Sequence, residues 1–168
     1  MGEVWVGYDQ ANAGKRTLTN TSISISSWLA IDRGNGVIGS QSVVSLYDSA
    51  RSSVNTYTGL TIVSNGTLLV NGIVANPVTV AAGTVGVRGK IMGAVTVNPL
   101  GILAPGNAAI GTLTNNTMTL LGTTVAQISR NSGVLTSDKV VGLTTLNYGG
   151  ALIVTNAGPD ALQIGDTF

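Results

Sequence analysis

The sequence contains neither cysteine nor histidine. Without cysteine, the chain can form no disulfide and offers no thiolate nucleophile. Without histidine, it lacks the commonest general base and the commonest metal ligand, which excludes Ser-His-Asp catalysis, His-based zinc sites and histidine pH switches. The side chains that remain for chemistry are seven carboxylates, eight cations and four tyrosines.

Charge is scarce as well. Only 9% of the 168 residues are charged, whereas about a quarter is usual in globular domains. The net charge is +1 and 43% of the residues are apolar, so the composition predicts a folded chain rather than a disordered one. Its solvent face must consist of Thr, Ser, Asn and Gly, which is typical of stacked extracellular β-structure. The sequence offers no broad basic surface for nucleic acid.

Long apolar runs are missing too. No run approaches the length of a membrane span, and the first ten residues, MGEVWVGYDQ, lack the charged and apolar regions of a signal peptide. We therefore expect either a cytosolic protein or a piece excised from a longer one.

Short β-like phrases fill the chain. From Tyr57 onward, three to six Val, Ile, Leu or Thr residues are followed repeatedly by Gly or Asn. Apolar residues alternate with Thr in 60–62, Val78–Val80 and Val95–Val97, which predicts strands with one buried face. Residues 1–56 follow the same pattern less cleanly.

Strands this short fit either an antiparallel sandwich or a solenoid. The single-residue or two-residue turns, the likeness of the phrases and the near absence of helical periodicity favour the solenoid. Coils of about 20–25 residues predict a parallel β-helix of roughly seven coils. Such a stack needs caps at its ends, and because neither end of the sequence resembles one, we interpret the chain as an uncapped internal segment.

The stretch GNAAIGT, residues 106–112, contains most of a P-loop. The P-loop lysine is replaced by Thr112, and no helical pattern follows the second glycine. We therefore predict no nucleotide and no other cofactor here. Instead, Pro105, Gly106 and Gly111 are interpreted as a structural corner between two strands.

The acidic residues are scattered, and three of them lie beside a cation: Asp32 beside Arg33, Asp48 near Arg51, and Asp138 beside Lys139. Surface ion pairs are the favoured interpretation. A further hypothesis is that stacking brings Asp32 and Arg33 of one coil near Asp48 and Arg51 of another. Such a group could bind or cleave a polysaccharide.

Two further cations, Arg88 and Lys90, alternate in sequence and are expected on the same side of one strand. They could meet an anionic partner or interrupt edge pairing, and the second is favoured. Asn65 and Asn115 each begin an Asn-x-Thr pattern, for which stacked asparagine ladders are favoured over glycosylation.

Residues 57–114 carry a run of phrases in a characteristic order: TGLTIVSNGTLLVNG, VTV, GKIMGAVTV, LAPGN and GTLT. This run resembles the autotransporter-associated β-strand repeat of bacterial type V secreted proteins. One departure is 85–90, VGVRGK, where that family more often has small residues. The resemblance covers 57–168 well and 1–56 loosely.

The resemblance implies a right-handed parallel β-helix that is secreted or displayed on a bacterial surface. In that family the repeats generally act as a stalk or a secretion and folding aid, and no catalytic residue carries over. The chain is thus expected to be one non-enzymatic solenoid segment, with looser rungs in 1–56, the clear repeat in 57–114 and continuing rungs in 115–168.

Two alternatives stay open. One is an adhesin or self-associating surface protein, and the other is a polysaccharide-acting β-helix enzyme. The expected partners are further copies bound through the solenoid ends or faces, or a host or matrix glycan or protein. No nucleic acid is expected, and membrane contact would arise only through a C-terminal barrel of the longer protein.

Overall fold

The computed structural model describes residues 61–107 and 109–168, together with the backbone of six strands within residues 1–60. Its regular structure is all β, without a helix among the described residues. The prediction of an all-β fold is therefore confirmed. No helix that could cross a membrane occurs in this part of the chain.

Three sheets contain the strands. Sheet 1 has the order β1 (Val4–Val6), β4 (Leu29–Ile31), β7 (Thr61–Val63), β10 (Val78–Val80), β13 (Val95–Val97), β16 (Thr117–Leu120) and β20 (Thr145–Tyr148). Sheet 2 has the order β2 (Lys15–Thr19), β5 (Val43–Tyr47), β8 (Thr67–Val70), β11 (Thr84–Val87), β14 (Ile102–Pro105), β17 (Thr123–Asn131) and β18 (Val134–Ser137), and β21 (Ala151–Asn156) also pairs with β17. Sheet 3 has the order β3 (Ser24–Ile25), β6 (Val54–Tyr57), β9 (Ile73–Val74), β12 (Lys90–Ile91), β15 (Thr112–Thr114) and β19 (Lys139–Val141).

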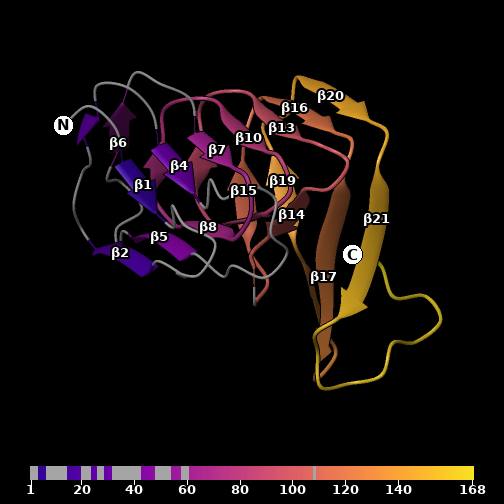
Figure 1. Cartoon of the computed structure of the whole chain (residues 1–168). Coiled ribbons are helices and arrows are strands. Elements are labelled where there is room, and N and C mark those ends of the chain that lie inside the picture. Colours follow the sequence, from indigo (N-terminus) through magenta and orange to yellow (C-terminus); the bar gives the residue numbers. More distant parts are fainter. Residues whose placement is uncertain are drawn as a thin grey trace.

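The chain visits the three sheets in turn and then returns to the first one. Strands that neighbour each other within a sheet are therefore never consecutive in sequence, apart from β17 and β18. That pair is antiparallel, whereas the stacking pairs from β7 to β16 and onward to β20 and β21 are parallel. Figure 1 shows the strands stacked side by side from β1 to β20. This architecture is solenoid-like and excludes the antiparallel sandwich.

The Val-Thr-Val phrases behave as the alternation predicted. In β10, Val78 and Val80 are fully buried while Thr79 between them is half-buried. The strand β13 repeats this pattern and stacks on β10 with Val78 opposite Val95. Alternate residues of each strand thus enter the core.

The prediction for 60–62 is wrong by one residue. In β7 the buried positions are Thr61 and Val63, and Ile62 lies half-buried on the outer side. The register explains the shift, because Val63 pairs with Val80 and Thr61 with Val78. A slip of one residue reverses the faces of a strand, so stacking on the buried valines of β10 determines which residues of β7 point inward.

The spacing between stacked positions is not uniform. It is 17 residues from Val78 to Val95, 23 from Val95 to Met118 and 28 from Met118 to Leu146. The shortest spacing falls below the predicted 20–25 residues, since corners such as Gly89 allow strands to follow one another almost directly. At Gly89 a Cβ would clash with the Gly72 carbonyl oxygen.

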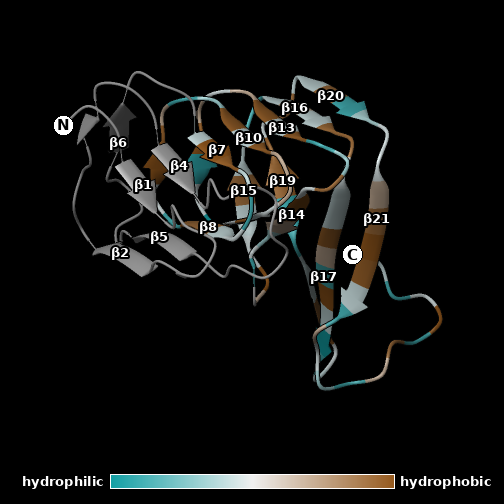
Figure 2. Cartoon of the chain, viewed as in Figure 1, coloured by the Kyte–Doolittle hydropathy of each residue, from teal (hydrophilic) through white to brown (hydrophobic). Residues whose placement is uncertain are grey.

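The core is a row of apolar side chains inside the stack. Sheet 1 contributes two columns, of which one runs through Val63, Val80, Val97 and Leu120. Figure 2 shows the hydrophobic residues along β10, β13 and β14. The full set of buried apolar side chains is Val63, Leu68, Val70, Val74, Val78, Val80, Val85, Val87, Ile91, Val95, Val97, Leu103, Leu113, Met118 and Leu120.

The strand β17 is the longest and projects past its neighbours. Its first residues stack on β14, its later residues form a hairpin with β18 through the turn at Ser132 and Gly133, and β21 lies along its other edge. Both central residues of the turn have positive φ, at 49° and 81°, as tight hairpin turns require. In Figure 1, β17 and β21 extend beyond the other strands.

Candidate functional site

The P-loop-like stretch forms a corner between β14 and β15. Gly106 has a φ of +78° and Asn107 a φ of +58°, a conformation that glycine adopts without strain. A Cβ at Gly111 would lie 2.5 Å from the Gly106 Cα and 2.8 Å from the Arg88 Cγ. Gly106 and Gly111 therefore lie in the corner, whereas Pro105 is the buried last residue of β14.

The carboxylate of Asp138 crosses to this corner from the segment between β18 and β19. Its Oδ1 accepts a hydrogen bond of 2.8 Å from the Gly111 N–H, and its Oδ2 accepts one of 2.8 Å from the Gln127 N–H. One side chain thereby joins the corner to the start of the β17 projection. The predicted surface pair of Asp138 with Lys139 is wrong, because the described ion pair is Arg130 with Asp166.

The guanidinium of Arg88 holds the other side of the corner. Its Nη2 donates a hydrogen bond of 2.9 Å to the Ile110 carbonyl oxygen, and its Nε is buried without a partner in the described part of the chain. Beside it lies a hollow of about 120 Å³, lined in part by Leu69 and Asn107. The corner is thus clamped between a cation and a carboxylate.

Burial dominates the acid-base behaviour of Asp138. Loss of hydration raises the pKa of this carboxyl above its ordinary value, against the opposing effects of the Gln127 and Gly111 amides and of the Arg88 charge. The amide of Gly111, which in a P-loop would face a phosphate, already binds this carboxylate. The arrangement can therefore stabilise a corner, and the P-loop-like stretch has a structural role.

Four of the predicted binding residues, Asp32, Arg33, Asp48 and Arg51, lie outside the described residues. The structure therefore places neither the ion pairs nor the polysaccharide-binding group predicted for them.

The prediction that Arg88 and Lys90 share one side of a strand is wrong. Arg88 follows the end of β11, and Lys90 begins β12 after the corner at Gly89. The chain changes sheets between the two cations, so their alternation in sequence does not place them on one face. Arg88 is half-buried against the 106–111 corner, whereas Lys90 is exposed.

Asn115 is a structural residue that the sequence pattern did not reveal. Its side chain is 2% exposed, and its Nδ2 donates hydrogen bonds of 2.8 Å to the carbonyl oxygens of Ile91 and Gly93. Its Oδ1 accepts one of 2.9 Å from the Thr117 N–H. Asn115 thus bonds to the backbone of the adjacent coil rather than to another asparagine, and only its position in a corner between strands could have suggested this.

Asp138 should make stability depend on pH in a direction opposite to that of an ordinary paired carboxylate. Because its folded pKa is raised, the folded state holds the proton more tightly than the unfolded state. The stabilisation is complete below the unfolded pKa and is lost as pH rises through the folded one. We expect the free energy of unfolding of the wild type, relative to Asp138→Asn, to fall as pH rises from the ordinary aspartate range through the raised pKa of the folded state.

Urea unfolding at a series of pH values measures this difference. Lys139→Gln is the matched control, because it removes the neighbouring exposed charge and should leave the pH profile parallel to that of the wild type. The assignment would be contradicted if the free energy of unfolding of the wild type, minus that of Asp138→Asn, rose with pH.

In the described part of the chain, no three His, Cys, Asp or Glu side chains gather where a metal ion could be held. Comparisons of the chain with protein-family models, with curated proteins and with solved structures gave no match.

Proposed function

We propose that this chain is a non-enzymatic structural segment of a secreted or surface-displayed bacterial protein. It forms a right-handed parallel β-helix of about seven coils and acts as a rigid stalk. Its stepwise folding outside the cell helps to draw the polypeptide outward, since each coil that stacks on the last one adds buried surface.

The observation that carries the proposal is the continuous core. In sheet 1, from Val63 to Leu120, each inward residue lies on an inward residue of the next coil, and every such valine, leucine and methionine is buried. Parallel strands stacked in this way resist bending because each coil is bonded to its neighbour through three sheets at once. A stack built in this way forms a rigid rod.

The ordered phrases of residues 57–114 supply the cellular context. Their resemblance to the autotransporter-associated β-strand repeat supports a bacterial surface location within a longer precursor that ends in a membrane barrel. Threonines such as Thr79 and Thr96 occupy outer positions of these strands, which suits an uncharged extracellular surface. A host or matrix glycan or protein would then be bound by the module that the stalk carries.

The proposal assigns structural roles to the charged side chains of the corner. Asp138 accepts hydrogen bonds from the backbone amides of Gly111 and Gln127. Arg88 donates one to the backbone carbonyl of Ile110. Removing either one should weaken the stack rather than abolish a reaction.

Display on the surface of a Gram-negative cell tests the stalk and secretion roles together. The chain is placed between a reporter domain and an outer-membrane barrel, behind a signal peptide, and is compared with a Gly/Ser linker of equal length. We expect severalfold more reporter accessible to antibody on intact cells with this chain than with the linker. Equal accessibility would overturn the proposal.

A pair of variants in β8 makes the same experiment specific to folding. Leu68 points into the core and Leu69 points outward. Leu68→Ala should lower the displayed amount and Leu69→Ala should not. If both variants were displayed like the wild type, coil folding would not be what assists export.

A further inference from the structure

The outer face of sheet 3 carries two lysine side chains that form no ion pair or hydrogen bond in the described part of the chain. In β12, Ile91 is buried and Lys90 before it is exposed. In β19, Val140 packs against the core and Lys139 beside it is exposed. Alternate residues of a strand point to opposite faces, so both lysines project outward. They rise from the flat side of the sheet, so a strand added beyond β19 would not cover them.

The two lysines flank β15. Lys90 lies opposite Thr114 on one side of this strand, and Lys139 lies opposite Thr112 on the other side. Both threonines are half-buried on the outer face, while Leu113 between them is buried. With strands about 4.8 Å apart and residues about 3.3 Å apart along each strand, the Cα atoms of the two lysines are roughly 12 Å from each other. Two well-separated cations therefore lie on either side of a row of hydroxyl groups.

A hollow lies at each end of β15. The hollow after its last residue has a volume of about 340 Å³ and is lined in part by Lys90, Thr114 and Asn116. The hollow before its first residue also has a volume of about 340 Å³ and is lined in part by Lys139 and Ser137. Volumes of this size are within the range of ligand-binding clefts. The two hollows and the outer face of β15 between them are called the β15 strip below.

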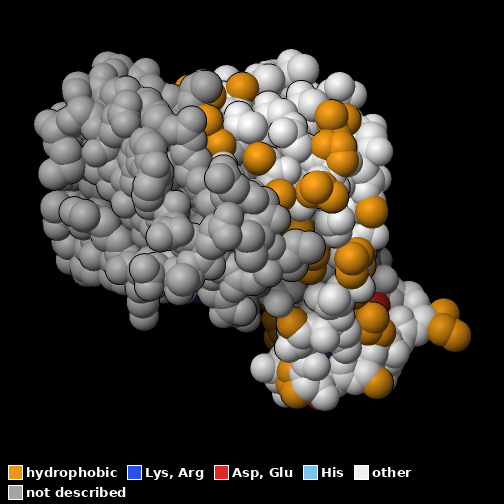
Figure 3. Space-filling view, viewed as in Figure 1, with side chains coloured by type: hydrophobic (Ala, Val, Ile, Leu, Met, Phe, Trp, Pro, Cys, Tyr) orange, Lys and Arg blue, Asp and Glu red, His pale blue; other side chains and the backbone are white. Residues whose placement is uncertain are grey.

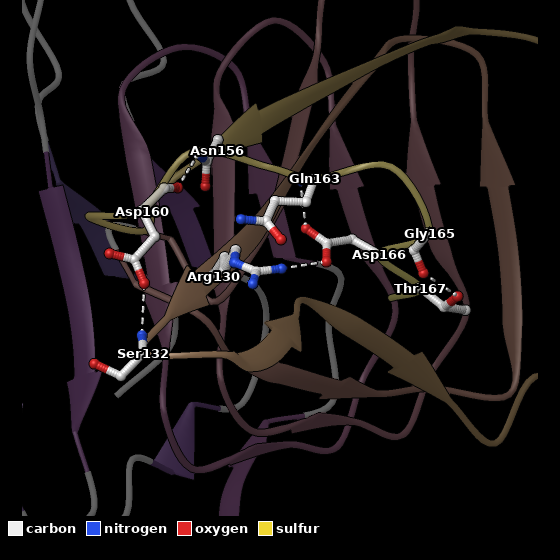
Figure 4. Close-up of polar contacts among 8 residues, drawn as sticks. All are labelled: Arg130, Ser132, Asn156, Asp160, Gln163, Gly165, Asp166 and Thr167. Carbon is white, nitrogen blue, oxygen red and sulfur yellow. Dashed lines mark hydrogen bonds and ion pairs between the residues drawn. The ribbon is translucent and has the colours of Figure 1, made fainter.

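The described carboxylates do not neutralise the β15 strip. Asp138 is held by two backbone amides of the corner and of β17. Asp166 forms an ion pair with Arg130, and Asp160 accepts a hydrogen bond of 2.6 Å from the Ser132 N–H. Figure 4 shows Asp160 and Asp166 turned toward these partners. Among the described residues, the positive charge of the strip therefore has no counter-charge bound to it.

Charge is sparse on the rest of the described surface. Figure 3 shows one face on which the described side chains are mainly hydrophobic or uncharged. Of the other two cations in the described part of the chain, Arg88 donates a hydrogen bond to the Ile110 carbonyl oxygen and Arg130 is in the ion pair. The lysines of the β15 strip are thus the described cations that remain available to an anion.

The spacing of these charges fits a sparse polyanion. DNA carries a charge about every 1.7 Å along its axis, and proteins that bind it make several phosphate contacts, whereas the strip offers two cations roughly 12 Å apart. Stacking of unpaired bases requires aromatic side chains, and the described residues that line the two hollows include none. A linear polysaccharide with a carboxylate on every second sugar has widely spaced charges, and its hydroxyl groups can exchange hydrogen bonds with threonine, serine and asparagine.

We propose that the β15 strip binds an acidic linear polysaccharide. The sugar chain lies along β15, its carboxylates meet Lys90 and Lys139, and its hydroxyl groups meet Thr112 and Thr114. The site is on the side of the stalk rather than at an end. The proposal goes beyond the stalk function and does not depend on it, because binding is measured on the purified chain in solution, whereas surface display measures export.

A nuclear magnetic resonance titration of the isotope-labelled chain tests the site. The probe is a hyaluronan hexasaccharide, which carries a carboxylate on every second sugar. We expect saturable shifts of the amide signals of Thr112, Thr114 and Asn116. A hexasaccharide of N-acetylglucosamine is the matched ligand without carboxylates and should bind about tenfold more weakly, since two charge contacts are missing. Absence of saturable binding, or shifts confined to the other sheets, would overturn the proposal.

Lys90→Gln and Lys139→Gln remove the two charges one at a time. Each variant should bind the hyaluronan probe about threefold more weakly and the double variant about tenfold more weakly, because an exposed charge contact contributes modestly. Raising the salt concentration from about 50 to about 200 mM should weaken binding by the wild type severalfold and change that of the double variant little, since salt screens exposed charges. A double variant that binds like the wild type would contradict the role of the lysines.

Moving the two charges to another sheet separates the site from the net charge. Thr79 and Thr119 point outward from β10 and β16, which are two strands apart in sheet 1. Adding Thr79→Lys and Thr119→Lys to the double variant restores the net charge with the cations roughly 10 Å apart, and it should not restore binding. The proposal would be overturned by restored binding. It would also be overturned if an oligothymidylate of six nucleotides bound the wild type as tightly as the hyaluronan probe does.

Discussion

Leu68→Ala is expected to lower the free energy of unfolding by about 2–5 kcal/mol. Leu68 is fully buried in β8 and lies in register with Val85 of the next coil. Truncating it removes apolar contacts and leaves a cavity that the neighbouring strands cannot close, because their backbones are held by ladder hydrogen bonds on both sides. Urea unfolding, followed by the negative far-ultraviolet circular dichroism signal of the strands, measures the change.

Leu69→Ala is the matched control for this prediction. Leu69 occupies the next position of the same strand, points outward and is only half-buried, so its truncation should cost about 1 kcal/mol or less. The two variants remove the same atoms from the same strand. Equal losses would contradict the assignment of an inner and an outer face to β8.

Asn115→Ala is expected to cost about 2–4 kcal/mol, since it leaves three backbone groups without their partner. The Ile91 and Gly93 carbonyl oxygens and the Thr117 N–H would lose hydrogen bonds at a position that is 2% exposed. The lost hydrogen bonds join two coils of the stack, so the substitution should also increase amide hydrogen exchange near Ile91. Chemical unfolding and hydrogen exchange measure the two effects.

Two further variants separate the amide from the loss of volume. Asn116→Ala changes an exposed neighbour and should stay within about 0.5 kcal/mol of the wild type. Asn115→Asp keeps the acceptor for Thr117 but turns an oxygen toward two carbonyl oxygens, so it should be at least as destabilising as Asn115→Ala. A stable Asn115→Asp variant would contradict the hydrogen-bond geometry.

Strand positions were predictable where the pattern is local. Val78–Val80 and Val95–Val97 alternate in a way that only a half-buried strand satisfies, and both strands form as predicted. Thr61 shows the limit of this reasoning. Its own neighbours suggest that it faces outward, yet stacking against Val78 places it in the core.

The corner residues were predictable only in part. Gly106 and Gly111 mark a turn in the sequence, because a positive φ and a close backbone approach both favour glycine. The partners of that turn were not visible. Asp138 lies 27 residues from Gly111, and its nearest cation in the sequence, Lys139, is not the group that it binds.

Composition and local pattern alone determined that this chain is all β, folded and poor in charge, with alternating strands separated by glycine and asparagine. These properties depend on each residue and its immediate neighbours. The tertiary structure decided which Thr is buried, which carbonyls Asn115 binds, and where Arg88 and Asp138 meet the corner. Those outcomes depend on the register between coils, which is determined by contacts between residues 17 to 28 positions apart and is therefore invisible in any single phrase.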